Sequence, residues 1–505
     1  MKHRLGFSVL LLTSLLSACA QTSTPGPESL PQGVAEDRDL ASTNALLSYF
    51  DPLTGVWIAP SGESWQPAVG LDSIINTYER TRDLKFLNVI EKSFWRYQGR
   101  RSDYYDDNGW YLNTWLRAYD VTGDPKYLQE AKNLFDVNKA GWDSVCGGGI
   151  YWTNARQNKN AITNELFLLS AAKLHRRAGN GTGAGSYYDW AMKTWNWFKN
   201  SGMINSQNRI NDGLNASCQN DQGLTWTYNQ GVILGALVEL YRFAGDRQYL
   251  SAAEKIATGT IQNQVYPGNI LKEAACETSS CPGADHLIFK GMFAQGLVRL
   301  VQADPKNPPQ QGFLTFLNTN ANSVWTTSRD SNNGLGFIWK GPVGTVNQAT
   351  QSAASLLLSG IALLNNGGEA TTPPATTGTL YEAEKATLHN IPTESSSAGY
   401  TGTGYVAGWN HDGQWLDFHV NAPAAKRYTL TFRYATGAGD AVRYLYVNGQ
   451  GRANNLLFTG TRGWDRWSTV SFSVPLNAGD NTISLIFDGS KASDNYLNLD
   501  SLQVK

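Results

Sequence analysis

Two adjacent carboxylic acids, Asp106 and Asp107, are the residues of this chain whose types and spacing point most directly to chemistry. They lie within residues 104–110, the run Tyr-Tyr-Asp-Asp-Asn-Gly-Trp, so aromatic rings flank them on both sides. Neighbouring acids repel each other when both are ionised, and one therefore tends to keep its proton at a raised pKa. A protonated acid beside an ionised carboxylate is the pair that cleavage of a glycosidic bond requires. Acids also suit the positive end of a helix dipole, but the aromatic setting favours a sugar-cleaving site.

The overall composition suits a neutral, polyhydroxylated ligand. Only 16% of the 505 residues are charged and the net charge is −1, so no electrostatic footprint for nucleic acid is present. The chain instead holds 17 Trp, 23 Tyr and 50 Gly. The length is sufficient for two or three domains with substantial cores. We expect a monomer that binds a polysaccharide and no nucleic acid.

The N-terminus predicts export and a lipid anchor. Lys2 and Arg4 precede an apolar run, residues 5–16, that is too short to span a bilayer and has the form of a secretion signal. The run ends in Leu-Ser-Ala-Cys, which resembles the bacterial lipobox, where the cysteine is lipidated and becomes the first mature residue. We therefore predict a signal peptide over residues 1–19, lipidation of Cys19 and attachment to the bacterial cell envelope. An ordinary signal with an incidental cysteine is the alternative.

Four further cysteines, an even number in an oxidising compartment, favour disulfides. Cys276 and Cys281 enclose four residues, so a small local loop is their natural pairing. That pairing leaves Cys146 with Cys218, although the sequence permits other connectivities. A metal site is the competing interpretation, but no histidine lies at ligand spacing near these cysteines.

Residues 41–366 read as one helix after another. Three segments share an apolar-periodic helix, a short turn and an Asp suited to N-capping, namely Asp83, Asp124 and Asp246. Repeated helical hairpins indicate a solenoid or a closed ring. At about 27 residues per helix and loop, six hairpins fit this length and predict an (α/α)6 toroid. An open superhelix is the alternative, but irregular loops rich in Trp and Asn favour a ring with a decorated cleft.

The ends of the chain differ from this helical region. Residues 20–40 are rich in Ser, Thr, Pro and Gly and predict a flexible tether, and residues 367–378 predict a Thr/Pro linker. From residue 379 to residue 505 the pattern changes to short runs of alternating apolar and polar residues separated by Gly and Asn turns. Runs of this kind predict an all-β domain, a jelly-roll β-sandwich.

The acidic pair in its aromatic setting resembles glycoside hydrolase family 76, whose members are endo-α-1,6-mannanases with an (α/α)6 barrel. The supporting motifs lie at residues 147–152 (Gly-Gly-Gly-Ile-Tyr-Trp), 160–165 (Asn-Ala-Ile-Thr-Asn-Glu) and 227–231 (Thr-Tyr-Asn-Gln-Gly), with a weaker one at 289–291. The resemblance covers most of residues 41–366. It is specific as a set, although each tripeptide alone is weak.

The resemblance implies a retaining mechanism, in which Asp106 is the nucleophile and Asp107 the general acid/base, without a metal. Retention needs the two carboxyl groups about 5–5.5 Å apart. Consecutive residues diverge by about 100° around a regular helix, so we expect the pair at a loop–helix junction. The predicted substrate-binding residues are Trp110, Tyr151, Trp152, Tyr228, Asn229 and Gln230.

The C-terminal domain resembles carbohydrate-binding modules of families 6 and 35. The matching segments are residues 381–384 (Tyr-Glu-Ala-Glu), 399–406, 463–467 and 498–500. The resemblance implies a structural Ca²⁺, for which Glu382 and Glu384, on one face of a strand, and Asp500 would converge as ligands. It also implies a ligand site at the loop end of the sandwich. The best matches to that site by position are Trp409, Trp464 and Asn495, with Trp467 competing with Trp464 for one role.

Together these features predict a secreted, lipid-anchored glycoside hydrolase that cleaves internal α-1,6-mannosidic bonds and is held on α-mannan or a related polymer by its module. One alternative keeps the toroid and changes the chemistry, as in an unsaturated glucuronyl hydrolase, for which a cationic cleft would be expected. A transglycosylase of the same family is a second alternative. The third is a non-catalytic glycan-capture lipoprotein, which loss of either aspartate would favour, and here both are present.

Overall fold

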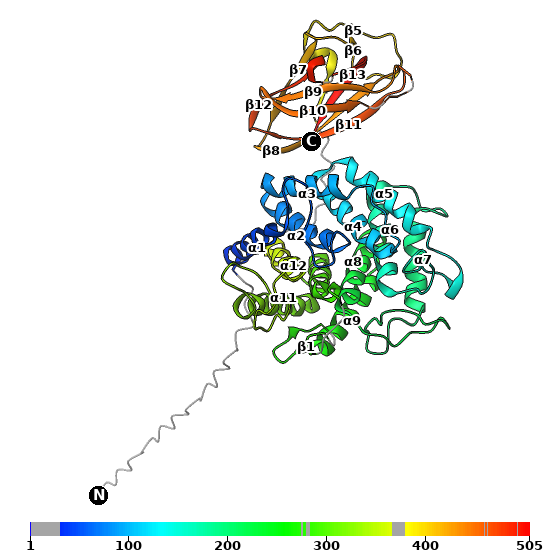
Figure 1. Cartoon of the computed structure of the whole chain (residues 1–505), viewed down its shortest axis with the longest axis vertical. Coiled ribbons are helices and arrows are strands. Elements are labelled where there is room, and N and C mark those ends of the chain that lie inside the picture. The colour runs from blue at the N-terminus through cyan, green and yellow to red at the C-terminus, as the bar shows by residue number, and fades with distance from the viewer. Residues whose placement is uncertain are drawn as a thin grey trace.

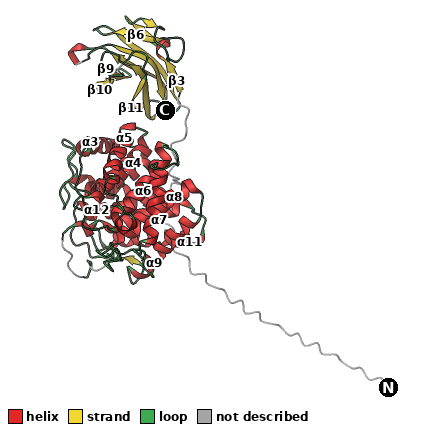
Figure 2. Ribbon diagram, turned by 90° about the vertical axis from the view of Figure 1, so that its right-hand side faces the viewer, coloured by secondary structure: helices red, strands yellow, loops and turns green. Residues whose placement is uncertain are grey.

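The computed structural model describes residue 1 and residues 31–273, 276–278, 283–365, 379–458, 460–461, 463–491 and 493–505. The described chain forms an N-terminal helical domain and a C-terminal β domain, shown in Figure 1 and coloured by secondary structure in Figure 2. The predicted signal peptide with Cys19, the first part of the tether and the linker 367–378 lie outside the described residues. None of the described helices is long and apolar enough to cross a membrane.

The helical domain is a ring of six inner helices, as the toroid prediction required. Each inner helix packs against the next, and the last packs against the first, so the ring closes. The inner helices are α2 (Gln66–Thr81), α4 (Tyr105–Thr122), α6 (Ala161–Ala178), α8 (Thr227–Ala244), α10 (Phe289–Ala303) and α12 (Gln348–Asn365).

Six outer helices cover this ring, and each packs against one or two inner helices. Inner and outer helices alternate along the chain, so the inner helices run parallel to one another. The outer helices are α1 (Gln32–Leu46), α3 (Leu84–Tyr97), α5 (Pro125–Lys139), α7 (Tyr187–Asn200), α9 (Gln248–Asn263) and α11 (Pro308–Thr327). A two-stranded ribbon, β1 (Val265–Tyr266) with β2 (Ile270–Leu271), follows α9.

The repeated Asp residues start outer helices, as predicted. Asp83 accepts a hydrogen bond from the backbone N–H of Lys85 at the start of α3, and Asp124 caps α5 in the same way. Asp246 accepts from the backbone N–H of Gln248 at 2.9 Å. Each cap satisfies one of the backbone donors that a helix start leaves free.

Small residues allow the inner helices to approach closely, as the sequence of α8 indicated. A Cβ added to Gly231 of α8 would lie 2.3 Å from the carbonyl oxygen of Met292. A Cβ added to Gly296 of α10 would lie 2.1 Å from the carbonyl oxygen of Gly231. Larger side chains at these two positions would therefore push α8 and α10 apart and open the ring.

The helical domain begins earlier than predicted. Residues 32–40 were expected to belong to the tether, but they form the first part of α1, which packs on α12. Asp39 is fully buried and accepts hydrogen bonds from Thr77 at 2.7 Å and from Arg80 at 2.9 and 3.0 Å. The sequence did not indicate this part of α1, because the side chain that it buries is Asp39, an acid paired with α2, and not an apolar residue.

The C-terminal domain is a β-sandwich, which confirms the predicted all-β fold. One sheet has the order β10-β9-β12-β7-β4 and the other the order β11-β8-β13-β6-β5, with β3 also paired to β13. The first sheet comprises β10 (Gln450–Phe458), β9 (Ala441–Val447), β12 (Gly479–Ile486), β7 (Trp415–Ala422) and β4 (Thr387–His389). The second comprises β11 (Ser468–Leu476), β8 (Lys426–Ala435), β13 (Leu497–Val504), β6 (Tyr405–Trp409), β5 (Thr393–Glu394) and β3 (Thr379–Glu382).

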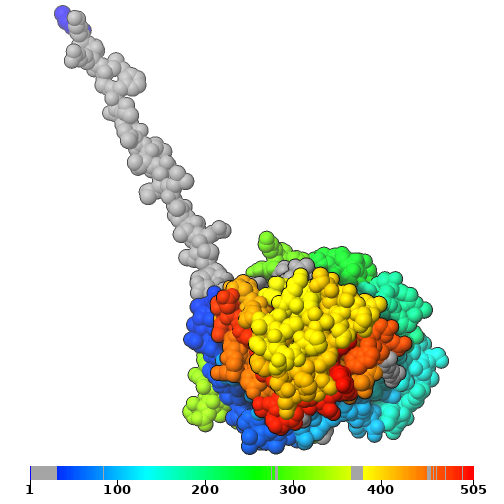
Figure 3. All heavy atoms as spheres, turned by 90° about the horizontal axis from the view of Figure 1, so that it is seen from above, coloured from blue at the N-terminus to red at the C-terminus, as the bar shows by residue number. Residues whose placement is uncertain are grey.

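The sandwich touches the helical domain near the C-terminal ends of α2 and α4. Thr429 of β8 donates a hydrogen bond to the carbonyl oxygen of Thr122 at 3.2 Å, and Arg427 lies 3.7 Å from Glu91 of α3. The view from above shows the sandwich lying over the helical domain (Figure 3). The module therefore contacts the end of the ring at which the inner helices finish.

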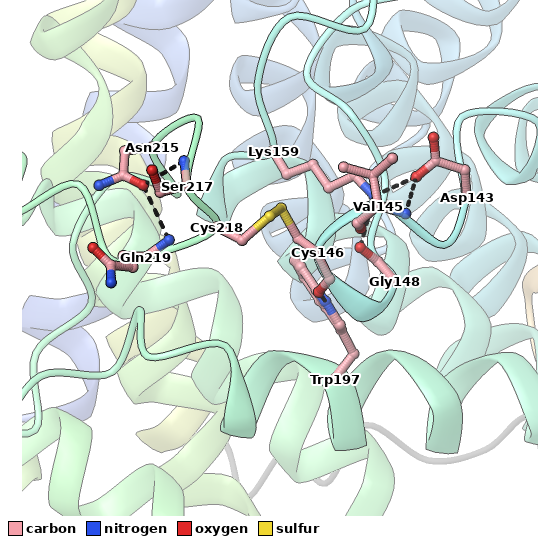
Figure 4. Close-up of a disulfide and its surroundings, with 10 residues drawn as sticks. All are labelled: Asp143, Val145, Cys146, Gly148, Lys159, Trp197, Asn215, Ser217, Cys218 and Gln219. Carbon is pink, nitrogen blue, oxygen red and sulfur yellow. Dashed lines mark hydrogen bonds and ion pairs between the residues drawn. A yellow bond between two sulfur atoms is a disulfide. The ribbon is translucent and has the colours of Figure 1, made fainter.

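A disulfide joins Cys146 to Cys218, as predicted, and links two loops of the helical domain (Figure 4). Beside it, the ammonium group of Lys159 donates to the carbonyl oxygens of Val145 and Gly148 at 2.7 Å each. Cys276 is also disulfide-bonded. Its predicted partner, Cys281, lies outside the described residues.

Candidate active site

A cavity of about 140 Å³ opens where the inner helices begin. Trp65 directly precedes α2, Asn160 directly precedes α6, and Tyr228 and Phe289 lie in the first turns of α8 and α10. Because these helix starts come from far apart in the sequence, the ring assembles the site. The full lining is Trp65, Asp106, Trp110, Trp152, Asn158, Asn160, Asp212, Tyr228, Asp285 and Phe289.

Asp106 and Asp107 lie in the first turn of α4, at the loop–helix junction that the sequence predicted. Asp106 lines the cavity, where its Oδ2 accepts a hydrogen bond from Trp152 Nε1 at 2.9 Å. Its Oδ1 accepts from the backbone N–H of Asp107 at 3.0 Å. Asp107 accepts from the Ser102 hydroxyl at 3.0 Å. Each carboxyl group is thus held in a different environment by different donors.

Both acids have raised pKa values. Burial raises the pKa of Asp106 to about 8, and the neighbouring charge of Asp107 adds to the effect. Burial also raises the pKa of Asp107 to about 6, with a further contribution from Asp285. Between about pH 6 and pH 8 the pair therefore holds one proton, which is the state that acid-assisted attack on a glycosidic bond needs.

Stacked aromatic rings form one wall of the cavity. The rings of Trp65 and Trp110 stack with centroids 5.1 Å apart, and those of Tyr228 and Phe289 stack at 3.8 Å. Trp110 and Tyr228 join the two pairs at 6.4 Å. Such a wall offers flat apolar surface next to the acidic pair, which suits the apolar face of a sugar ring.

The described lining of the cavity carries acids and no lysine or arginine. Asp212 and Asp285 face the same space as Asp106. Burial raises the pKa of Asp212 to about 6. A cationic cleft would have favoured an enzyme for acidic sugars, so the anionic lining speaks against the unsaturated glucuronyl hydrolase alternative and for a neutral sugar.

The predicted substrate-binding residues divide into two groups. Trp110, Trp152 and Tyr228 line the cavity. The prediction is wrong for Gln230, which is fully buried and bonds the backbone of Ile210. The long amide of that residue fixes the loop ahead of α8 and does not reach the cavity.

The predictions for Tyr151 and Asn229 also need correction. Tyr151 does not line the cavity, because its ring is buried beneath the ammonium group of Lys159, 4.6 Å from the ring centroid. Asn229 is fully buried and donates to Asp212 at 3.2 Å. It therefore acts through Asp212, by positioning a carboxylate that does line the cavity.

Sequence reasoning missed Trp65, Asp212 and Asp285. The last two lie more than 100 residues from Asp106 along the chain, and no local motif marked them. One signal was present: the residues that precede or begin each inner helix meet at one end of a ring. Applied to every predicted inner helix, that rule would have selected Trp65, Asp285 and Phe289.

The sequence comparison decides the family, because residues 35–372 match glycosyl hydrolase family 76. The chain belongs to glycosyl hydrolase family 76. The mannan endo-1,6-alpha-mannosidase DCW1 of Saccharomyces cerevisiae is 29% identical over 208 residues, which cover 39% of this chain and 44% of the yeast protein. The chain thus spans less than half the length of that relative.

Solved structures of family 76 share the fold. The GH76A α-1,6-mannanase from Salegentibacter sp. HEL1_6 is 25% identical and superposes with a TM-score of 0.58, over 65% of this chain and 99% of that one. A variant of that mannanase with two consecutive aspartates replaced by asparagine is inactive and was solved with α-1,6-mannotriose. This family 76 chain also has two consecutive aspartates, Asp106 and Asp107, at the start of α4, and Asp106 lines its cavity.

The C-terminal domain of this family 76 protein matches the carbohydrate binding module of family 6 over residues 382–505. An isomaltosyltransferase of Sporosarcina globispora is 38% identical over 124 residues, which are 25% of this chain and 11% of that protein. The β-sandwich is therefore a carbohydrate-binding module attached to a glycoside hydrolase domain.

One predicted ligand residue of the module is wrong. Trp409 is fully buried in the core of the sandwich, where its Nε1 donates to the carbonyl oxygen of Gln414 at 3.2 Å. The guanidinium group of Arg443 covers the ring at 4.8 Å. A strand residue that points inward has no face for a sugar, and spacing alone did not reveal which way this side chain points.

The structure separates the two competing tryptophans. Trp467 donates from Nε1 to the carbonyl oxygen of Ala398 at 2.9 Å and packs under Arg433, so its ring is committed to the fold. Trp464 is half-buried and lies against Gly437, where an added Cβ would be 2.7 Å from the ring. Asn495 bonds the backbone of the same loop at residues 438 and 440. Trp464 and Asn495 therefore lie together at one loop of the module.

The three predicted calcium ligands converge on one turn. Thr401 donates through its hydroxyl to Glu382 at 2.8 Å and to Asp500 at 2.9 Å. Glu384 accepts from the backbone N–H of Thr403 at 2.8 Å. However, the carboxyl group of Asp500 is also paired with Arg433 at 2.5 Å, and no cluster of three metal-binding side chains forms within the described ranges.

Proposed function

We propose that this protein is a retaining endo-α-1,6-mannanase that a carbohydrate-binding module holds on its polymer. The observation that carries the proposal is the Asp106–Asp107 pair at the start of α4, which shares one proton near neutral pH beside a wall of stacked rings. Family membership and the names of the relatives support α-1,6-mannan as the substrate.

In the proposed mechanism Asp106 attacks the anomeric carbon while Asp107 protonates the departing glycosidic oxygen. The resulting glycosyl–enzyme ester is then hydrolysed by a water that Asp107 deprotonates. Two N–H groups donate to Asp106, and neither can accept a proton, so both favour its carboxylate form. The wall formed by Trp65 and Trp110 would hold the sugar ring over this carboxylate.

One property of the pair opposes this assignment. Asp106, with a pKa of about 8, takes up a proton before Asp107, with a pKa of about 6, whereas a nucleophile must be ionised. For Asp106 to attack, the shared proton must move to Asp107. The N–H donors to Asp106 favour that transfer and its burial opposes it. The reverse assignment, Asp106 as acid and Asp107 as nucleophile, is therefore the alternative that an experiment must exclude.

The substrate proposal is tested by reducing-end release from polymers that differ in linkage. The purified protein should release reducing ends from linear α-1,6-mannan. It should leave α-1,2-linked mannan, β-1,4-linked mannan and α-1,6-linked glucan intact. Short products of several lengths at early times would support internal cleavage. Release of mannose alone would contradict endo action, and transfer to added mannobiose without net release would show a transglycosylase.

We further propose that the module binds polysaccharide through Trp464 and Asn495. Trp464→Ala should weaken retention on insoluble α-mannan while activity on short soluble mannan stays at the parent level. Trp409→Phe is the matched control, because that ring is buried and its replacement should leave retention unchanged. Equal retention by the parent and Trp464→Ala would remove this loop as the ligand site.

We also propose a structural Ca²⁺ held by Glu382, Glu384 and Asp500. Glu384 Oε2 is buried without a hydrogen-bond partner among the described residues. A Cβ on Gly402 would lie 2.4 Å from the other oxygen of Glu384, so the turn fits closely around these carboxyl groups. An ion that bridges them would satisfy that oxygen. Chelation by EDTA should lower the melting temperature of the full chain, and added Ca²⁺ should restore it. No shift on chelation would exclude the site.

Export and lipid anchoring rest on the N-terminal sequence, and we propose Cys19 as the lipidated first residue of the mature protein. Cys19→Ala should block lipid attachment and processing. Mass spectrometry of the mature N-terminus decides the point, because fractionation would not distinguish an uncleaved signal from a lipid. An unmodified N-terminus downstream of Cys19 would make this an ordinary secreted enzyme.

A further inference from the structure

A second cavity of about 70 Å³ lies inside the ring, on the far side of Trp110 from the helix starts. Trp110 lines this inner cavity as well as the catalytic one. A water needs roughly 10–15 Å³ by this measure, so the inner cavity has room for several waters or for a small ion with water. Its occupant is set by the charges around it.

Basic side chains outnumber acidic ones in the lining. Five are basic and three acidic, so the formal charge of the lining is +2 when all eight side chains are ionised. The basic residues are Arg117, Lys173, Arg177, Arg242 and Arg299, and the acidic ones are Asp72, Asp120 and Glu239.

Three of the five basic residues are paired. Arg177 forms an ion pair with Asp120 at 2.5 Å, and Arg242 pairs with Glu239 at 2.9 Å. Arg117 pairs with Glu79, which lies outside the lining, at 3.0 Å. These pairs account for two of the three lining acids.

Lys173 and Arg299 form no ion pair with any described residue. Lys173 is 8% exposed, and its ammonium group donates no hydrogen bond within the described chain. Arg299 donates to Gln302 at 3.0 Å and to Asn76 at 3.4 Å, both neutral amides. Burial, and to a smaller extent repulsion from Arg177, lowers the pKa of Lys173 to about 7. Burial, and to a smaller extent repulsion from Arg117, lowers the pKa of Arg299 to about 9.

Asp72 is the lining acid that acts on both cations and forms no ion pair with a described residue. Asp72 accepts from Gln295 at 3.3 Å through Oδ2, and its Oδ1 has no hydrogen-bond partner among the described residues. Its single negative charge can balance one of the two cations. Because the pKa of Lys173 is about 7, Lys173 is protonated below about pH 7, and in that range one positive charge in the cavity is left without a partner. Buried charges without a partner are costly, and a bound counter-ion removes that cost.

Helix ends do not supply the missing charge. Cations in the last turn of a helix are stabilised by the negative end of its dipole, an effect that falls off within one turn. Arg177 and Arg242 lie in such last turns and are also ion-paired. Lys173 lies five residues before the end of α6 and Arg299 four before the end of α10, so they lie at or beyond that limit.

We propose that the inner cavity binds a small monovalent anion, of the size and charge of chloride, between Lys173 and Arg299. The ion supplies the charge that the lining lacks and ties α6 to α10 across the lumen of the ring. It acts as a structural counter-ion beneath Trp110, apart from the hydrolytic reaction.

Bromide, which replaces chloride and scatters anomalously, tests the site directly. Crystals of the full protein grown with sodium bromide should show an anomalous peak between Lys173 and Arg299. A cavity without such a peak in these crystals overturns the proposal. This measurement uses the unaltered chain, so it holds even where a cavity variant fails to fold.

Melting temperatures provide the second test. At pH 6, where Lys173 is protonated, and at constant ionic strength, replacing gluconate, which is too large for the cavity, by chloride or bromide should raise the melting temperature with a saturable dependence on concentration. Lys173→Met should abolish the dependence, and Lys199→Met, at an exposed position of α7, should keep it. An equal dependence in Lys173→Met and the parent contradicts the proposal. Stabilisation by phosphate alone, without a halide effect, would likewise exclude a monovalent ion.

Discussion

The two ends of the inner-helix ring carry opposite charges, and they differ in how many of those charges are paired. Where the helices begin, Asp106, Asp212 and Asp285 line the cavity without any lysine or arginine in its described lining, and Asp107 follows Asp106 in the first turn of α4. Where they finish, arginines gather, and most of them are paired with acids at 2.5–3.0 Å. Six parallel helices place about half a positive charge each at the first end and half a negative charge at the second. The same backbone thus stabilises acids at one end and bases at the other.

The difference lies in what is left unpaired. At the end where the inner helices finish, which we call the closing end, Arg177 is paired with Asp120, and Glu239 is paired with three arginines. At the end where the inner helices begin, which we call the opening end, Glu165 is fully buried, and neither of its carboxyl oxygens has a hydrogen-bond partner among the described residues. Burial and the nearby Asp212 raise its pKa well above its usual range. The ring therefore leaves acids unpaired where the chemistry is proposed, whereas most of its charges at the other end are paired and Lys173 and Arg299 are the exceptions. Unpaired acids at the proposed site are expected when a site is selected against local stability.

The largest expected effect comes from removing the acids at the opening end. Asp106→Asn should abolish turnover of every substrate, because the nucleophile is lost. Asp107→Asn should lower activity on mannan by about 10³-fold or more, yet keep much of it on aryl mannosides whose leaving groups need little protonation. Initial rates on mannan and on an activated aryl mannoside measure both effects.

The outcome also decides the roles. If Asp106→Asn keeps the aryl mannoside activity and Asp107→Asn loses it, the assignment is reversed, in agreement with the order of the two pKa values. Asp103→Asn is the control, because this nearby acid is exposed and bonds Asn154 at 2.6 Å, away from the cavity. If both Asp106→Asn and Asp107→Asn cleave mannan within tenfold of the parent, neither acid is catalytic.

Activity should depend on pH as a narrow bell. Below about pH 6 both acids are protonated and no nucleophile remains, whereas above about pH 8 both are ionised and no proton donor remains. The value of kcat/KM on soluble mannan should therefore peak near pH 7 and fall about tenfold per pH unit on each side. A profile that is flat from pH 5 to pH 9 would show that the pair does not share a proton.

A smaller effect is expected from the donor to Asp106. Trp152→Phe keeps an aromatic ring but removes the N–H that stabilises the carboxylate form of Asp106. Hydrogen bonds to charged groups contribute about 1.5–3 kcal/mol, so kcat/KM should fall at least tenfold. The pKa of Asp106 should rise and move the alkaline limb to higher pH. A purely structural role of Trp152 would lower the melting temperature without moving either limb.

The smallest effects concern stability and should have opposite signs at the two ends of α4. A pKa raised on folding means that stability is greatest below the unfolded value and is lost as the pH rises toward about 8. At pH 7 Asp106→Asn removes this cost and should raise the melting temperature. Asp120→Asn leaves Arg177 partly unpaired and should lower stability by about 2 kcal/mol, since the pair is not fully buried. Calorimetry of both variants measures the contrast, and equal signs would contradict it.

The fold was predictable because its signals are local and repeated. Asp83, Asp124 and Asp246 mark helix starts, small residues in α8 indicate an inner helix, and alternation marks the strands of the module. Asp106 and Asp107 were found for the same reason, since the pair and its aromatic neighbours lie within seven residues. Signals of this kind need no knowledge of which segments meet in space.

The remaining site residues could not be predicted, because they depend on contacts between distant segments. Asp212 and Asp285 reach the cavity through ring closure, which no short motif encodes. Trp409 was assigned to the wrong side of a strand, because a shift of one residue exchanges the buried and exposed faces. Gln230 lies in a motif that resembles the family, yet its amide is used to hold a loop.

The module contacts the end of the ring at which the inner helices finish, and this contact separates the proposed ligand site of the module from the catalytic pair. The inner helix α4 has 18 residues and spans about 27 Å from the catalytic pair to that end. Strand β8 then runs for about 25 Å from the contact at Arg427 and Thr429 to Ala435. The loop that follows it carries Gly437, against which Trp464 packs. If Trp464 binds polysaccharide as proposed, the chain that it holds lies far from the catalytic cleft. The module would then bind one polymer chain while the cleft cleaves another chain nearby.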